Sequence, residues 1–124
     1  MKAQNPTVFV IKEQVVRGDL GPTPMDYTPA YKFGDVQFIT DFDLPLHGKG
    51  TLTLAWHKAA HHFCQVYDDS RDFIICTGQP LAIFVIGHML GRYHKQPRIL
   101  VWRPQERVYQ PIEFVAGELQ EVLV

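Results

Sequence analysis

The stretch CTGQPLAIFVIGHMLGR, residues 76–92, decides the fold of this chain. It joins a Gly-Gln-Pro turn to an almost unbroken apolar run. Pro80 suits the first helical position, because the N–H that proline lacks would have no acceptor there. This start signal and the length of the run predict a buried helix over residues 80–91. Three residues before it are expected to face a ligand: Thr77, Gly78 and Gln79.

The other elements follow from β-branched runs, apolar periodicity and turn residues. We expect a strand lying partly on an edge at 7–16, further strands at 36–40, 73–76 and 98–102, a helix at 51–69 and an antiparallel strand at 108–115. Residues 17–34 are dense in glycine and proline, so we expect a long ordered loop there. Gly91 and a basic cluster should end the second helix favourably against its dipole: Arg92, His94 and Lys95.

This order of elements predicts an α/β fold, because alternating strands and helices form parallel sheets through right-handed crossovers. We expect a single domain over residues 1–124, with two or three layers, a mostly parallel sheet of about five strands and two main helices. The strands at 36–40, 73–76 and 98–102 should be parallel neighbours. Over residues 36–103 this architecture resembles half of a doubly wound nucleotide-binding fold.

Open parallel sheets bind ligands beyond the carboxyl ends of their strands, where the helices also begin. Free N–H groups of helix amino ends, together with a lysine and an arginine, would suit a phosphate or a carboxylate. The sequence therefore predicts a binding module for a small anionic, nucleotide-like ligand. The predicted ligand-binding residues are Thr40, Asp41, Lys49, Thr51, Thr77, Gly78, Gln79 and Arg103. The alternative at residues 78–80 is a tight strand-to-helix turn with no ligand.

Known catalytic and cofactor motifs fail when compared letter by letter. Gly48-Lys49-Gly50-Thr51 resembles the end of a Walker A loop, but the required earlier glycine is replaced by Leu44. No dinucleotide fingerprint is present, so no cofactor is expected and no catalytic residue is assigned. His57 and His61 share a helix face and offer an alternative metal site, against which the neighbouring Lys58 argues. Hydrolysis of a nucleotide-like substrate stays a second alternative to ligand binding.

Composition restricts the partners and the compartment. The 12 Lys+Arg residues against 13 Asp+Glu residues leave a formal charge of -1, which lacks the basic footprint of a nucleic-acid binder. The run LAIFVIGHML is too short to span a membrane, which takes roughly 20 residues. The first ten residues do not have the pattern of a signal peptide. Cys64 and Cys76 lie in apolar settings, so we expect reduced thiols and a bacterial cytoplasmic location.

The helix at 80–91 is apolar on every side, so one face packed on the sheet cannot bury all of it. A second cover is needed, either the loop at 17–34 or another subunit, and we expect a homo-oligomer. A second functional hypothesis follows from this surplus of apolar surface. In that alternative the chain is a protein interaction or assembly module without a small-molecule ligand.

The phrase DFIICTGQPLAIFVIGHMLGR and the later pattern W-R-x-x-x-x-x-Y-x-P also resemble small uncharacterised α/β proteins of tailed bacteriophages. The resemblance covers residues 72–114. It implies a compact accessory protein, of phage or host-interaction type, that acts in a bacterial cytoplasm. It implies no catalytic residue.

Overall fold

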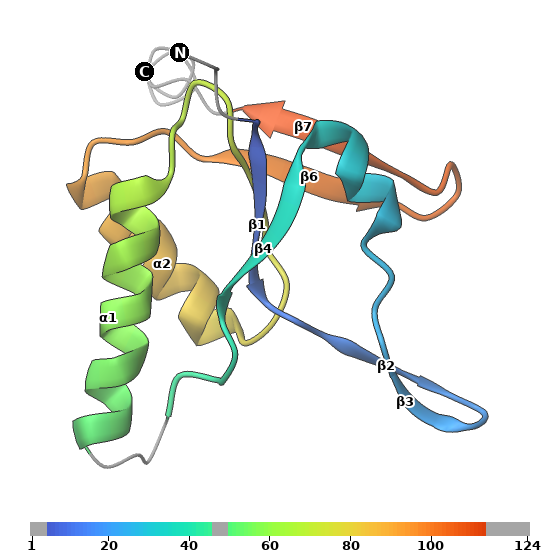
Figure 1. Ribbon diagram of the computed structural model, residues 1–124, viewed down its shortest axis with the longest axis horizontal. Helices are drawn as coiled ribbons and strands as arrows, with labels where there is room; N and C mark the ends of the chain where they lie inside the picture. The colour runs from blue at the N-terminus through green and yellow to red at the C-terminus, as the bar shows by residue number, and fades with distance from the viewer. Residues whose placement is uncertain (1–4, 46–49, 114–124) are drawn as a thin grey trace, which may run out of the picture.

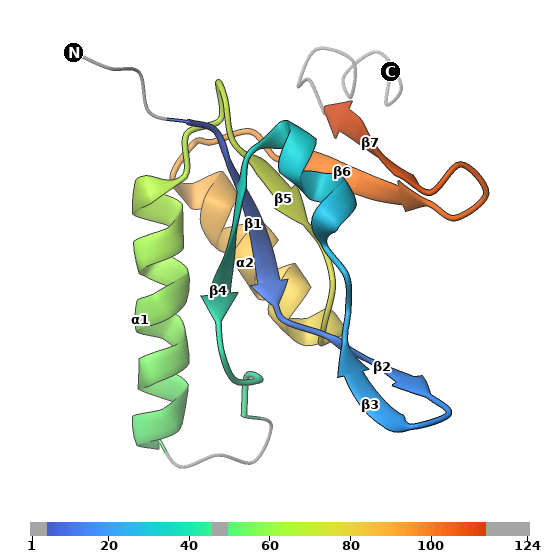
Figure 2. The ribbon, with the colours of Figure 1, turned by 45° about the vertical axis from the view of Figure 1, so that its right-hand side comes forward.

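The structure is a computed structural model, which describes residues 5–45 and 50–113 (Figure 1). Five strands form one sheet in the order β4-β1-β5-β6-β7, in which only β7 is antiparallel to its neighbour (Figure 2). The elements are β1 (Thr7–Lys12), β2 (Val15–Gly18), β3 (Gly21–Pro24), the 3-10 helix η1 (Thr28–Phe33), β4 (Asp35–Thr40), α1 (Gly50–Val66), β5 (Phe73–Ile75), α2 (Pro80–Arg92), β6 (Arg98–Arg103) and β7 (Val108–Glu113). The predicted fold class, a mostly parallel sheet of five strands with two long helices, is confirmed.

The sequence predicted that the first strand lies partly on an edge. In the structure it is an interior strand of the sheet. β1 pairs with β4 on one side and with β5 on the other. The expected adjacency of residues 36–40 and 73–76 is therefore wrong, because β1 lies between them. Both faces of β1 are apolar and buried, since Val8 and Val10 point to one face and Phe9 and Ile11 to the other. A strand buried on both faces belongs in the interior of a sheet.

Residues 17–34 are not a long loop. They hold most of the antiparallel hairpin β2–β3, followed by η1. The turn of the hairpin passes through Gly21, whose φ of 105° lies in the left-handed region that glycine tolerates. The hairpin projects from the body of the molecule, while η1 packs back onto the sheet (Figures 1 and 2). The glycines and prolines of this segment therefore serve a turn and a short helix.

The two faces of the sheet are covered unequally. α1 and α2 pack on one face around Trp56, Phe63 and Ile86, and of the described helices only η1 packs on the other, through Ala30. From β1 the chain crosses to β4 over the η1 face and then returns through α1 and α2 on the helix face. This reversal makes β1 and β5 the topological switch point, where sheets of this kind offer a crevice beyond the carboxyl ends of the strands.

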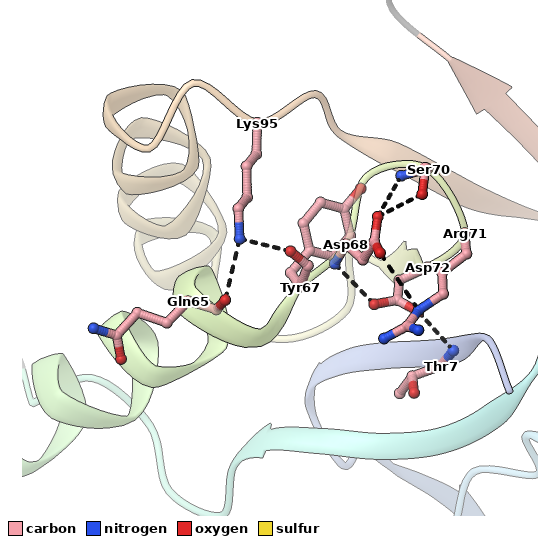
Figure 3. A network of polar contacts seen from close by, with 8 residues as sticks. All are labelled: Thr7, Gln65, Tyr67, Asp68, Ser70, Arg71, Asp72 and Lys95. Carbon is pink, nitrogen blue, oxygen red and sulfur yellow. Dashed lines mark hydrogen bonds and ion pairs between the residues drawn. The ribbon is translucent and has the colours of Figure 1, made fainter. Parts of the chain in front are cut away.

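The sequence predicted that Lys95 stabilises the carboxyl end of α2. In the structure its side chain caps the carboxyl end of α1 instead. α2 continues through Gly91 and ends in a Schellman motif, in which His94 takes the left-handed conformation with φ of 57°. The Lys95 ammonium donates hydrogen bonds to main-chain carbonyls at the carboxyl end of α1 (Figure 3). Nearby, the buried Asp72 carboxylate accepts the main-chain N–H groups of Thr7 and Asp68, both at 2.9 Å (Figure 3). These contacts fix α1 to the sheet at the amino ends of β1 and β5.

Candidate functional site on the open face of the sheet

A pocket of about 230 Å³ lies at the carboxyl ends of β1 and β4, and we call it the carboxyl-end pocket. Two of the predicted ligand residues, Thr40 and Asp41, line it. The Thr40 hydroxyl donates to the Ile11 carbonyl at 3.2 Å, so it holds the two strands together. The described residues that line it are Lys12, Glu13, Val15, Pro24, Phe38, Thr40 and Asp41.

The charges of the carboxyl-end pocket do not favour an anion. Glu13 and Asp41 place two exposed carboxylates on its rim. Lys12 is the only lysine among the described residues that line this pocket, and its ammonium lies 3.4 Å from the carboxylate of Asp43. Because that ion pair already offsets the lysine charge, a phosphate entering the pocket would meet net negative potential. A cationic group is the better electrostatic fit.

Two further pockets continue from this one across the face that η1 only partly covers. A central pocket of about 290 Å³ shares Glu13 and Phe38 with the carboxyl-end pocket. An outer pocket of about 200 Å³ shares Met25 and Asp26 with the central pocket. We call these three pockets together the open face. The central pocket is lined by Glu13, Met25, Asp26, Tyr27, Thr28, Tyr31, Val36 and Phe38, and the outer pocket by Met25, Asp26, Trp102 and Tyr109.

Aromatic rings supply much of the open face. Phe38 packs edge-on against the buried Tyr27, with ring centroids 5.6 Å apart, and is 41% exposed. At the other end of the face Trp102 packs on the buried Tyr109 at 5.0 Å and is 40% exposed. The buried ring of each pair holds the exposed one in place. Half-exposed, fixed aromatic rings are typical of protein-binding surfaces.

Asp26 keeps a negative charge at the junction of the central and outer pockets. Its carboxylate accepts hydrogen bonds from the hydroxyl and the main-chain N–H of Thr28. These bonds, the hydroxyl bond first, lower the pKa of the Asp26 carboxyl below its usual value. The open face is therefore anionic at neutral and mildly acidic pH.

The three predicted ligand residues before α2 differ in how they are held. The Gln79 amide donates to the Leu44 carbonyl at 3.1 Å and accepts the Leu44 N–H at 3.0 Å, which pins the segment after β4 to the amino end of α2. Gly78 has a φ of 118°, and a Cβ at this position would lie 3.2 Å from the Gln14 side-chain nitrogen. The Thr77 hydroxyl oxygen is buried and has no hydrogen-bond partner within residues 5–45 and 50–113.

Of the remaining predicted ligand residues, Arg103 is not brought close to the first turn of α2. Arg103 ends β6 at the tip of the β6–β7 hairpin, and both ribbon views place that tip away from the first turn of α2 (Figures 1 and 2). Lys49 lies outside the described residues. Thr51 lies in the first turn of α1, which begins one residue earlier than expected, at Gly50.

The alternative metal site has little structural support. In the part of the chain that the structure describes, no three His, Cys, Asp or Glu side chains lie close enough to hold a metal ion. His61 shares a hydrogen bond with the Tyr93 hydroxyl, and His57 packs edge-on against Trp56.

Cys76, expected in an apolar setting, is exposed just beyond β5, yet partial desolvation of its thiol raises its pKa. A raised pKa works against a thiolate nucleophile.

Sequence reasoning missed most residues of the open face, among them Glu13, Asp26 and Phe38. The sequence contained one signal of this face. In β4, Val36 and Phe38 point to one face of the strand and Ile39 points to the other. An edge strand that is apolar on both faces has more apolar surface than one layer of helices covers.

The chain was also compared with known proteins. The model of one protein family, described as Phage Pam3 gp32-like protein, matches residues 6–116. No curated protein and no solved structure matches the chain. Within the described residues, the helices lack the length and apolar composition that a membrane span requires.

Proposed function

Because the chain belongs to the Phage Pam3 gp32-like protein family, we propose that it is a phage accessory protein that binds a protein partner on its open face. The observation that carries this proposal is the row of three adjoining pockets, which combines exposed aromatic rings with carboxylates. We place this binding in the cytoplasm of the infected bacterium.

The size of the pockets favours a protein partner over a nucleotide. Their volumes are about 230, 290 and 200 Å³. Sites for small molecules usually measure roughly 300 to 1,000 Å³ and bury most of the ligand. Each pocket suits one side chain, and the row of three suits several side chains of one peptide segment.

The chemistry of the open face indicates what that segment carries. Carboxylates of Glu13, Asp26 and Asp41 attract lysine or arginine side chains. A guanidinium can also stack on the exposed ring of Phe38 or Trp102, where cation–π attraction is worth about 0.5–2 kcal/mol. The β2–β3 hairpin borders the face with Val15 and Pro24 and ends in the fully exposed Leu20. We therefore expect a basic segment interrupted by apolar residues.

The test uses overlapping peptides that cover the proteins of a phage encoding a family member, probed with the purified full-length chain. Bound peptides should be basic, and binding should weaken as ionic strength rises. Glu13→Lys should weaken binding of such a peptide at least about tenfold, because it reverses a charge shared by two pockets.

Glu106→Lys is the matched control, since Glu106 is exposed in the β6–β7 turn and lines none of the three pockets. It should bind peptides like the wild type. Selection of acidic peptides, or equal loss of binding in both variants, would contradict the proposal.

A second candidate function is anion binding at the amino end of α2, favoured by the Thr77 hydroxyl, which is buried and finds no hydrogen-bond partner among the described residues. Thr77→Val separates this function from a purely structural turn. If the hydroxyl serves a ligand, the variant loses affinity for nucleotides or inorganic phosphate in calorimetric titration. If the hydroxyl binds no ligand, the wild type binds none of these anions. The variant is then more stable than the wild type, since an unsatisfied polar group has been removed.

A further inference from the structure

The outward side of α2 carries a second apolar surface, independent of the open face. Phe84 is 76% exposed and Leu81 is 43% exposed. Gly87 and Gly91 follow on the same side, and a Cβ built on either would meet nothing within 4 Å. We call these four residues, together with the exposed His88 between the glycines, the α2 stripe.

The described residues do not supply the second cover that the sequence predicts for this helix. Residues 17–34 were one possible cover, but η1 packs on the opposite face of the sheet. On the same side of the sheet as α2, Val101 and Ile112 also stay 37% exposed. The outer strands therefore also leave apolar side chains uncovered on this side of the sheet.

The α2 stripe has two unlike halves. Its amino-terminal half is bulky, with the side chains of Leu81 and Phe84. Its carboxyl-terminal half is hollow, because Gly87 and Gly91 bear no side chain. When two copies of α2 pack antiparallel, the bulky half of each lies over the hollow half of the other. A surface that complements itself in this way generates a two-fold symmetric dimer.

The charges at the two ends of α2 match the same arrangement. Exposed Asp43 lies at the amino end, on the segment that Gln79 pins to the helix, where the neighbouring Lys12 offsets part of its charge. Exposed Arg92 and His94 lie at the carboxyl end. Antiparallel packing brings the acidic end of each copy toward the basic end of the other, and the helix dipoles also oppose favourably.

From these observations we infer that the chain forms a symmetric dimer through antiparallel contact of the α2 stripe with the α2 stripe of a second copy. Phe84 of each copy fills the space over Gly87 and Gly91 of the other. Because α2 and η1 lie on opposite faces of the sheet, the dimer keeps both open faces free. The dimer therefore presents two copies of the open face, which we propose as the binding surface for a protein partner. Dimer formation does not depend on that proposed function.

Sedimentation of the full-length chain over a micromolar concentration series tests the dimer. Wild type should pass from monomer to dimer as its concentration rises. Phe84→Asp should raise the dissociation constant at least about a hundredfold, because symmetry removes two buried rings and each contributes roughly tenfold or more. Leu20→Asp is the matched control: Leu20 is fully exposed at the hairpin tip, and the variant should dimerise like the wild type.

Gly91→Leu tests whether a variant loses its dimer because the space over α2 is filled, and not because the fold is damaged. The isolated chain has room for the new side chain, so its thermal midpoint as a monomer should stay equal or rise. Its dimer should weaken at least about tenfold, because the space for Phe84 of the other copy is occupied. A wild type that stays monomeric throughout the series, or a Phe84→Asp variant that dimerises normally, would overturn the inference.

Discussion

Replacing Lys95 with methionine should destabilise the fold strongly, although Lys95 lies outside every helix and strand. Its ammonium nitrogen lies 2.6 Å from the Cys64 carbonyl oxygen, 2.7 Å from that of Tyr67 and 3.2 Å from that of Gln65. These carbonyls lie at or just beyond the end of α1, where a helix has no N–H groups of its own to offer. Lys95→Met keeps the apolar stem and removes all three donors.

The expected cost follows from the two shorter, partly buried bonds. A hydrogen bond to a charged group contributes roughly 1.5–3 kcal/mol, and water replaces part of that when the bond is half exposed. The Gln65 carbonyl is exposed, so its bond to Lys95 adds little. Lys95→Met should therefore lower the free energy of unfolding by about 2–4 kcal/mol. At roughly 4 °C per kcal/mol for a domain of this size, the thermal midpoint should fall by about 8–16 °C.

Urea unfolding followed by far-ultraviolet circular dichroism measures this difference. Lys58→Met is the matched control, because Lys58 is an exposed lysine in the middle of α1. It should change stability by less than about 0.5 kcal/mol. The reasoning fails if the two variants are equally stable, or if Lys95→Met loses less than about 0.5 kcal/mol with an unchanged denaturant slope.

Three other predictions concern the backbone and pH. Gly34→Ala should cost more than about 3 kcal/mol in urea unfolding, because its Cβ would lie 2.3 Å from the Pro6 carbonyl oxygen. His94→Gly should raise the free energy of unfolding by about 1 kcal/mol, since His94 is exposed with φ of 57°; no gain would mean that its conformation costs nothing. Burial raises the Tyr67 pKa from 10.0 to about 12, so the neutral phenol stabilises the fold below pH 10 and that stability should be lost as pH rises toward 12, with tyrosine absorbance changing alongside unfolding.

Local chemistry in the sequence was enough to determine the elements around the opening stretch. Pro80 and the apolar run after it predict α2, and the structure begins that helix at the same residue. The short run at 73–76 predicts a buried strand, which β5 confirms with all three residues buried. These predictions succeed because helix start signals and fully apolar strands depend on neighbours in sequence.

Only the tertiary structure decided the order of the strands and the location of the site. The sequence does not state that β1 lies between β4 and β5, since pairing joins residues such as Val8, Val36 and Phe73 that are far apart in the chain. Lys95 shows the same limit: its charge suggested a cap for its own helix, and packing of the two helices places it on α1. The open face likewise combines Glu13, Asp26 and Trp102 from three separate segments. Long-range pairing and helix packing are cooperative, so their outcome follows from the whole chain and not from any local pattern.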